Sequence, residues 1–293
     1  MARNLQFVTL LVALIALAIS PGCRNGAPAF VQLNQARQTT ADLRIQFAKE
    51  VDASNRAVMA ESDEASIAFA HEAQQASQTI EKGILSLASQ FTNLHFPLES
   101  RLLGEFEHHF SEYLVLDRSI LELAVENTNL KAQRLSFGAS REAANSFRKS
   151  LEPIISAVAT KDRCRADALA VKAALAVSEI QVLQAPHIAE ADAAVMSHME
   201  EEMDTLMVTT KEALGELSGL VGSKARGLVA HAQEELRRFK EISDQIVALS
   251  HRNSNVRSLD LALRARPPMT ATCDDSLRAI QDALTNEGSK ATR

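Results

Sequence analysis

Three side chains in the sequence have the spacing of metal ligands on one helix. Glu105, His108 and Glu112 are three and four residues apart, so a helix would place them on one face. Glu-x-x-His is also the spacing found in di-iron bundles, which need a second such motif and two more glutamates on facing helices. No second Glu-x-x-His occurs in the sequence. We interpret the pattern as an exposed polar face, with a weak surface site for zinc or another transition metal as the alternative.

A short phrase that occurs twice offers a second kind of chemistry. Residues 126–131 read Glu-Asn-Thr-Asn-Leu-Lys, and residues 252–257 read Arg-Asn-Ser-Asn-Val-Arg. Arginine can hold a carboxylate through two parallel hydrogen bonds, and asparagine can orient it. The alternative is that asparagine ends the helices while the cations lie in solvent. The candidate ligand-binding residues are Asn127, Asn129, Arg134, Arg148, Arg252, Asn253, Asn255 and Arg257, with Lys131 beside them.

Other reactive groups give weaker signals. In an oxidising compartment Cys164 and Cys273 could form a disulfide, and two separately buried thiols are the alternative. There is no Cys-x-x-Cys-His sequence, so we expect no haem with His187 or Met199 as axial ligands. Gly-rich phosphate loops, nucleophile elbows and zinc-protease helices are also missing from the sequence. We expect a protein without catalysis and without a cofactor.

The composition predicts helices as the elements that carry these residues. Of the 293 residues, 46% are hydrophobic and only 4% aromatic, with 10 Gly and 7 Pro. This profile is typical of long helices. Apolar residues at helical spacing predict helices over 31–91, 98 to about 129–138, 140–183, 187–220, 223–263 and 272–285. Ser62 is a candidate cap for a restart in the first helix, Pro186 a candidate break, and residues 266–268 a candidate stop.

The repeated phrase indicates how these helices are organised. Its offset also aligns identical pairs such as Ile120 with Ile246 and Ile154 with Ile280. We therefore predict an all-α, elongated antiparallel helical bundle made of two related helical units. The predicted units are residues 31–185 and 186–285, with a linker at 24–30 and a flexible tail at 286–293.

The first residues predict export. Residues 7–19 form an apolar run that is shorter than the roughly 20 residues of a membrane span. Cys23 follows a small residue at the end of this segment, which resembles a lipoprotein processing site. Three fates stay open for the segment 1–23: lipidation of Cys23, ordinary cleavage, or a retained anchor. In each, the rest of the chain would lie outside the cytoplasm, periplasmic or anchored to the membrane only at its N-terminus.

Several segments resemble a family of receptors. The run Phe106-x3-Phe110-x2-Tyr113, residues 120–124, residues 185–192 and residues 253–259 are similar to parts of the extracytoplasmic four-helix-bundle sensory domain of bacterial methyl-accepting chemotaxis receptors. The resemblance covers residues 31–284 and includes the bimodular helical variant. It implies an often dimeric bundle that binds a small organic acid or amino acid. The chain differs from the family because no second span and no signalling region follow residue 284.

These features define the functional hypotheses. The first is an exported, chemoreceptor-like binding protein that captures a small solute or presents a helical face to a partner. The second is a structural or adaptor protein of the cell envelope, and the third is a weak metal-binding bundle. The net charge of −6 argues against nucleic acid as a partner, because phosphate backbones require a concentrated basic surface.

Overall fold

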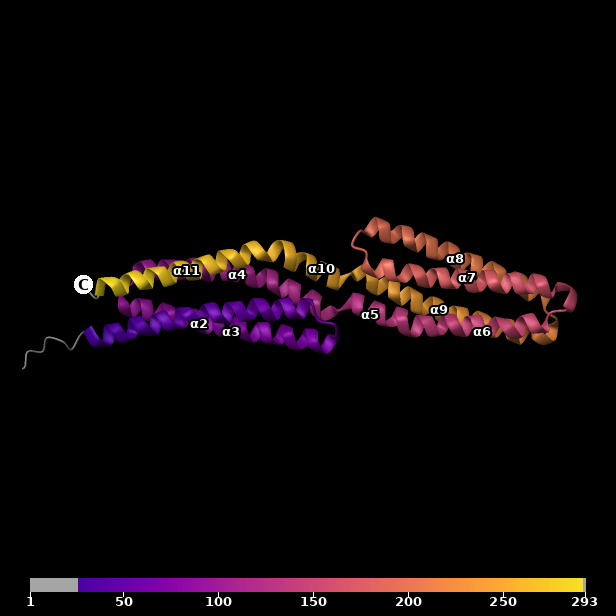
Figure 1. Cartoon of the computed structure of the whole chain (residues 1–293), viewed down its shortest axis with the longest axis horizontal. Helices are drawn as coiled ribbons and strands as arrows, with labels where there is room; N and C mark the ends of the chain where they lie inside the picture. Colours follow the sequence, from indigo (N-terminus) through magenta and orange to yellow (C-terminus); the bar gives the residue numbers. More distant parts are fainter. Residues whose placement is uncertain (1–25, 292–293) are drawn as a thin grey trace, which may run out of the picture. The chain divides into compact units, whose positions relative to one another are not determined.

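All regular structure between residues 26 and 291 is helical (Figure 1). The computed structural model describes residues 26–291, and no strand occurs between those two positions. The predicted all-α helical bundle is therefore confirmed. The long helices are α2 (Gly26–Val58), α3 (Asp63–Leu94), α4 (Pro97–Glu126), α6 (Arg141–Ala157), α7 (Arg163–Ala189), α8 (Ala193–Leu220), α9 (Arg226–Arg252) and α11 (Arg266–Ala291), and the short ones are α5 (Thr128–Leu135) and α10 (Ser254–Asp260).

The helices form two compact units. Within the described chain, unit 1 contains residues 26–50, 74–113 and 268–291, and unit 2 contains residues 51–73 and 114–267. Each unit therefore combines segments that are distant in the sequence. The predicted division at residue 186 does not coincide with these units, because that position lies inside α7 and both of its sides belong to unit 2.

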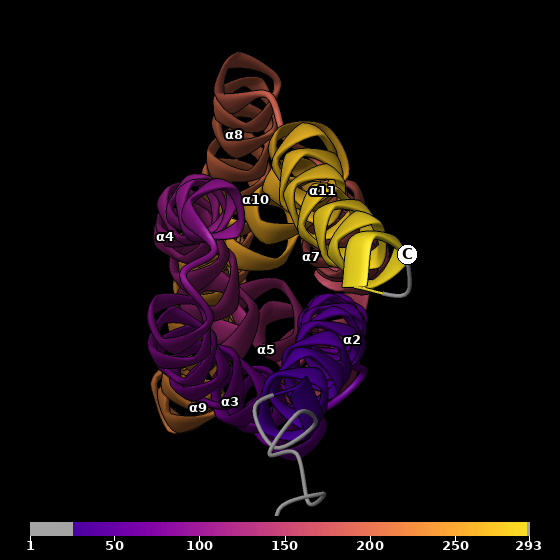
Figure 2. The same cartoon turned by 90° about the vertical axis from the view of Figure 1, so that its left-hand side faces the viewer.

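Unit 1 packs parts of α2, α3, α4 and α11 side by side (Figure 2). Aromatic rings fill its centre. Phe47 meets Phe110 and Tyr113 edge-on, with ring centroids 6.1 Å and 5.2 Å apart. The Tyr113 hydroxyl donates a hydrogen bond of 2.5 Å to the Glu50 carboxylate, so the phenol is satisfied although its ring is fully buried. The aromatic residues of α4 at positions 106, 110 and 113 are thus buried in the core of this unit.

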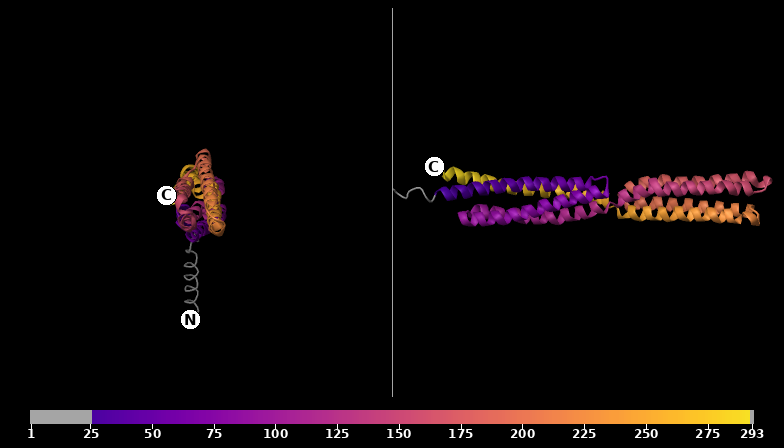
Figure 3. Two further views of the ribbon diagram at one scale, coloured as in Figure 1. Left: turned by 90° about the vertical axis from the view of Figure 1, so that its right-hand side faces the viewer. Right: turned by 90° about the horizontal axis from the view of Figure 1, so that it is seen from below.

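Unit 2 contains α5 to α10, and the right-hand view of Figure 3 shows its long helices running alongside one another. Helix α7 packs closely along α8, and α6 packs along α9. By contrast, α8 makes much less contact with α9 than with α7. The space between α8 and α9 is consequently the least tightly closed seam of the long helices in this unit.

Local sequence signals explain several helix ends. The Ser62 hydroxyl accepts a hydrogen bond from the Ala65 amide at 3.1 Å, as expected for a helix start. Asp192 caps α8 in the same way, accepting from the Ala194 amide at 2.8 Å. Pro97 is the first residue of α4, where a missing amide proton costs no helical hydrogen bond.

Other predicted boundaries are wrong. The helix expected over 140–183 is divided, because Val158 is extended and residues Thr160–Asp162 form a 3₁₀ turn before α7 begins. Pro186 does not break α7, which continues to Ala189. The prolines at 267 and 268 were expected to stop a helix, yet the helical run that begins at Ser254 continues through them, directly after the π-helical turn Leu261–Ala265. Helix α2 begins within the predicted linker, and α11 extends through the predicted tail to Ala291.

The repeated phrase occupies equivalent positions in the structure. Asn127 ends α4 and Asn253 ends α9, and both have φ 51° and ψ 38°, the left-handed conformation. A short helix, a π-helical turn and a long helix follow in each case. Asparagine is one of the few residues other than glycine that adopts this conformation routinely. The prediction that the phrase marks helix ends is confirmed, and both copies lie in unit 2.

The two phrases also bind each other directly. The Thr128 amide donates to the Ser254 hydroxyl, and the Ser254 amide donates to the Thr128 hydroxyl, each at 3.0 Å. The amides of Asn129 and Asn255 donate in the same reciprocal way to each other's side-chain oxygens, each at 3.1 Å. These bonds join residues 126 positions apart, so the sequence offset is repeated as a physical pairing. We call residues 127–129 and 253–255 the asparagine network.

The network is not perfectly symmetric. Asn253 accepts a hydrogen bond from Asn129 and donates one to the Glu190 carbonyl oxygen, both at 2.7 Å. Asn127 accepts one from Asn255 at 2.8 Å, but no described residue accepts from its buried side-chain amide. The Asn253 side chain therefore contributes more hydrogen bonds than its counterpart.

A second buried polar cluster, also in unit 2, is charged. The guanidinium of Arg266 lies 3.2 Å from Asp117, and both side chains are only 3% exposed. The Ser54 hydroxyl bridges them, accepting from Arg266 at 2.6 Å and donating to Asp117 at 2.5 Å. The residues at the repeat-equivalent positions, Ser140 and Ser243, instead surround the neutral amide of Gln184. The two interior positions are therefore polar in both copies of the repeat, but they carry charged side chains in only one of them.

We predict that Asn253→Ala destabilises the protein more than Asn127→Ala. The first change removes two side-chain hydrogen bonds of about 1 kcal/mol each and places alanine in the left-handed region, at a further cost of about 1–2 kcal/mol. The second removes one such bond at the same backbone cost. Urea unfolding followed by circular dichroism measures the difference. Asn253→Gly is the control for the backbone, and equal midpoints for Asn253→Ala and Asn253→Gly would contradict a contribution from the positive φ.

Candidate functional site

A polar pocket lies in unit 2 along the seam between α8 and α9. Its volume is about 280 Å³. Met203 and Met207 from α8, Val247 from α9 and Ile180 from α7 supply its apolar lining. Its polar lining consists of Glu200 and Asp204 on α8 and of Lys240, Ser243 and Asp244 on α9.

The polar lining is predominantly anionic. Three carboxylates face one ammonium group, and the Lys240 ammonium is already paired with Asp244 at 2.5 Å. Ser243, the single hydroxyl of this lining, accepts a hydrogen bond from the Gln184 amide at 3.3 Å. Glu200 and Asp204 add two further carboxylates to the lining. The pocket favours a ligand that carries a positive charge.

Glu200 occupies a core position of α8. Met196, Met203 and Met207 are buried at helical spacing, and Glu200 lies between them in the same stripe, with 28% of its side chain exposed. A carboxylate in such a position needs hydrogen-bond donors. Two imidazole nitrogens lie within hydrogen-bonding distance of it.

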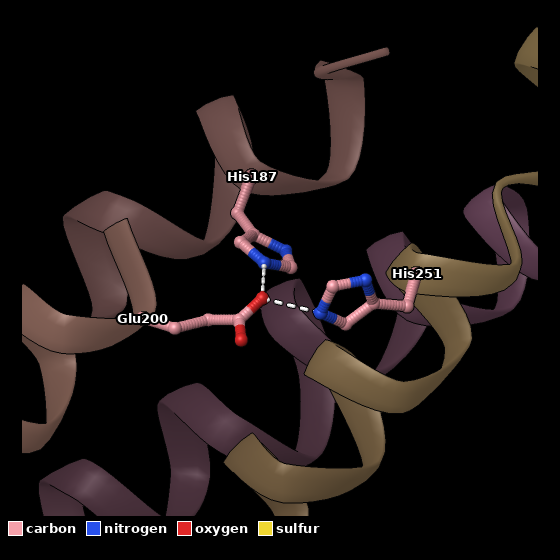
Figure 4. Close-up of side chains that lie close together, drawn as sticks. All are labelled: His187, Glu200 and His251. Atoms are coloured by element: carbon pink, nitrogen blue, oxygen red, sulfur yellow. Dashed lines mark hydrogen bonds and ion pairs between the residues drawn. The ribbon is translucent and has the colours of Figure 1, made fainter. Parts of the chain in front are cut away.

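His187 and His251 converge on one oxygen of Glu200 (Figure 4). His187 Nε2 lies 2.7 Å and His251 Nε2 lies 2.6 Å from Glu200 Oε1. The two rings are nearly perpendicular, with centroids 5.7 Å apart. His187 is fully buried, whereas 43% of the His251 side chain is exposed. We call these three residues the His-Glu-His cluster, and within residues 26–291 it is the group whose ligand atoms lie close enough together to hold a metal ion.

A serine of α9 contacts the buried histidine on the side of its ring that faces away from Glu200. His187 Nδ1 lies 2.9 Å from the Ser250 hydroxyl, which donates at 2.8 Å to the carbonyl oxygen of His187 itself. Ser250 is fully buried on α9, next to His251. One residue of α9 thus fixes the ring that faces Glu200, and the next residue provides the second imidazole.

The predicted ligand-binding asparagines are structural in this arrangement. Asn127, Asn129 and Asn253 are buried, and their hydrogen bonds go to one another, to Asn255 and to backbone carbonyls. The predicted cations lie elsewhere. Arg134 pairs with Asp63 at 3.1 Å, and Arg148 is exposed and hydrogen-bonds Asn145 at 3.5 Å.

Arg252 already holds a carboxylate, which belongs to Glu126. Its Nε donates to Glu126 Oε1 at 2.7 Å. This hydrogen bond is the main reason that the pKa of the Glu126 carboxyl is lowered, and the charges of Arg252, Arg257 and Lys131 lower it further. The arginine–carboxylate contact expected from the sequence is therefore found inside the chain, between the two copies of the phrase.

The predicted metal face on α4 is dispersed and exposed. His108 Nε2 lies 3.6 Å from Glu112, and Glu105 pairs with Arg101 at 3.4 Å. The site on that helix stays a prediction, with weaker geometry than the His-Glu-His cluster. From the sequence, His187 is a candidate only as a haem ligand, and neither Glu200 nor His251 is among the predicted site residues. The usable signal was a glutamate within the methionine stripe of α8.

The two described cysteines differ in their surroundings. Both are free thiols, with Cys164 exposed on α7 and Cys273 buried on α11. Burial raises the pKa of the Cys273 thiol to about 12, and the charges of Glu50 and Glu112 add to the effect. Cys23 and the export segment lie outside the described residues.

We predict that iodoacetamide alkylates Cys164 and leaves Cys273 unmodified in the folded protein at pH 8. The thiolate is the reacting species, and a thiol whose pKa is raised stays protonated until the pH approaches that value. Peptide mapping by mass spectrometry measures each site separately. In urea both cysteines should react. Rapid alkylation of Cys273 without denaturant would contradict the prediction that burial protects its thiol.

Comparisons with known proteins add no functional assignment. The sequence matches no family model, and no curated protein is similar to it. The resemblance to chemoreceptor sensory domains accordingly stays a prediction. Between residues 26 and 291, no helix combines the length and the apolar character that crossing a membrane requires.

Proposed function

We propose that this chain is a non-catalytic binding protein that captures a small amine-bearing solute, such as an amino acid, in the pocket of unit 2. The observation that carries the proposal is the lining, in which three carboxylates and one lysine surround methionine, valine and isoleucine side chains. An ammonium group would lie against Glu200 and Asp204. The apolar lining would accept the ligand's side chain.

The size of the pocket supports a small ligand. A volume of about 280 Å³ is slightly below the roughly 300–1,000 Å³ of pockets for drug-sized ligands, so the pocket suits a smaller molecule. An amino acid is such a molecule, and its carboxylate would face the Lys240 ammonium. Simple dicarboxylates fit the charge of the lining poorly, because they would meet Glu200 and Asp244 without enough cations.

We further propose that the protein acts outside the cytoplasm, in a role similar to that of a chemoreceptor sensory domain. The apolar run at residues 7–19 and Cys23 support export and an N-terminal lipid anchor. In this role the protein captures the solute and presents it, or a helical face, to an envelope partner or a second copy. The binding mode needs no cofactor and no nucleic acid.

The proposal predicts which solutes stabilise the protein. Amines and amino acids should raise the melting temperature in the presence of a metal chelator, since a ligand that binds only the folded state stabilises it. Dicarboxylates should have little effect. Asp204→Asn should reduce the shift because it removes one acceptor of the ammonium group. Glu216→Gln, an exposed change on the same helix outside the pocket lining, is the matched control.

Two results would contradict the proposal. One is a panel in which no amine or amino acid shifts the melting temperature. The other is stabilisation that is equal in the wild type and in Asp204→Asn, because the solute would then bind elsewhere. Stabilisation by dicarboxylates alone would instead support the hypothesis that the arginine residues of the repeated phrase bind a carboxylate ligand.

An adaptor function is the second candidate, and an exposed stripe on α7 favours it. Val171, Leu175 and Val182 lie on one face of the helix and are more than half exposed. The first two also line an apolar groove of about 320 Å³ between α6 and α7. Exposed apolar patches of this kind can mark protein interaction sites.

If this stripe pairs with a second copy, sedimentation velocity should show association that increases with protein concentration. Leu175→Lys should abolish the association, because it places a charge in the contact. Val208→Lys, at an exposed apolar position on α8, is the control. A wild type that stays monomeric at high concentration would exclude self-assembly through this face.

A further inference from the structure

We propose that the His-Glu-His cluster binds a divalent transition metal, with zinc as the probe ion. The ligands are His187 Nε2, His251 Nε2 and the Glu200 carboxylate, and water would occupy the fourth position. The inference is independent of the proposed solute, although Glu200 contributes to both sites.

The hydrogen bonds of Ser250 determine where the hydrogen of His187 lies. The Ser250 hydroxyl has one hydrogen and two neighbours, the His187 carbonyl oxygen at 2.8 Å and His187 Nδ1 at 2.9 Å. If that hydrogen went to Nδ1, the hydroxyl and carbonyl oxygens would face each other without a hydrogen between them. Nδ1 therefore carries a hydrogen and donates it to Ser250.

This orientation leaves His187 Nε2 directed at a carboxylate oxygen. A lone pair facing a carboxylate oxygen at 2.7 Å is repulsive, and a metal cation bound by both atoms would remove that repulsion. Metal-ligating histidines commonly donate their other ring N–H to a fixed acceptor in this way. The Ser250 contact therefore prepares His187 as a metal ligand.

The local electrostatics favour a positive ion. His187 lies in the last turn of α7 and His251 in the last turn of α9. The last turns of helices carry a partial negative charge from unpaired carbonyl groups, which stabilises cations. The carboxylate of Glu200 adds a full negative charge at the same point.

The geometry needs only a small adjustment. Zinc–nitrogen distances of about 2.0–2.1 Å place tetrahedral ligand atoms about 3.3 Å from one another. The Nε2–Oε1 distances of 2.7 Å and 2.6 Å are shorter, so Glu200 and His251 must move apart by less than about 1 Å. Both side chains reach solvent, which permits that movement and gives the ion a route of entry.

The ligand set is found in one repeat only. At an offset of 126 residues the sequence has Glu61, Gln74 and Val125 in place of His187, Glu200 and His251, so the two imidazoles have no counterpart there. The cluster is thus a separate chemical feature of the second repeat. Two imidazoles and one carboxylate suit zinc and its neighbours in the first transition series better than calcium or magnesium, which prefer oxygen ligands.

Titration of the chelator-treated full chain with zinc chloride, followed by calorimetry, tests the inference. We expect one zinc ion per chain. Glu200→Gln keeps a hydrogen-bond acceptor but removes the charge, and His251→Ala changes an exposed ligand, so neither should unfold the protein. Each should weaken zinc binding by at least about tenfold, and Ser250→Ala should weaken it by about 10–100-fold through the loss of orientation.

His198→Ala is the matched control, because His198 is exposed on α8 and lies outside the cluster. It should bind zinc as the wild type does, and so should His108→Ala. Cobalt provides a second measurement, since its visible absorption distinguishes four-coordinate from six-coordinate sites. Circular dichroism establishes that each variant is folded.

Three outcomes would overturn the inference: no zinc uptake by the wild type, undiminished uptake by both Glu200→Gln and His251→Ala, or equal loss in His198→Ala. Loss in His108→Ala alone would place the metal on α4. The solute proposal is judged separately, because its measurements use a chelator and the Asp204→Asn variant.

Discussion

The reciprocal hydrogen bonds of the asparagine network are the constraint on which the interior of unit 2 depends. They pair two copies of the same phrase, and each copy begins with an asparagine in the left-handed conformation that ends a long helix. The network also holds the end of α7, because Asn129 donates to the Ile188 carbonyl oxygen and Asn253 donates to that of Glu190. Buried polar groups of this kind are costly unless all partners are present, so the pairing specifies one arrangement of the helix ends.

The position of the His-Glu-His cluster follows from this arrangement. His187 immediately precedes the carbonyl that Asn129 binds, and His251 is two residues before Asn253. The two histidines are therefore brought together by the same contacts that join the helix ends. Ser250 contributes a further contact between α9 and α7, because its hydroxyl is hydrogen-bonded to both the backbone and the ring of His187. Helix α8 makes less contact with α9 than with α7, and the pocket that Glu200 helps to line lies between α8 and α9.

The two copies of the phrase lie in similar arrangements of helices, but the buried polar residues near them differ in charge. Equivalent interior positions carry the charged pair Arg266 and Asp117 in one place and Ser140 and Ser243 in the other. A buried ion pair is retained only when its charges and hydrogen bonds are matched, and Ser54 completes this one. The two copies of the phrase are thus followed by the same order of elements, while the buried polar residues around them differ.

The sequence by itself determined the helical class, most core stripes and the equivalence of the two phrases, because these depend on local periodicity and on an internal repeat. It did not determine which helices associate, since apolar stripes of similar composition can pair in several ways and each unit combines distant segments. For the same reason Arg252 could be expected to bind a carboxylate, but not that the carboxylate is Glu126. Glu200, His187 and His251 come from three helices, and only tertiary packing, which places the start of α8 beside the ends of α7 and α9, brings their ligand atoms together.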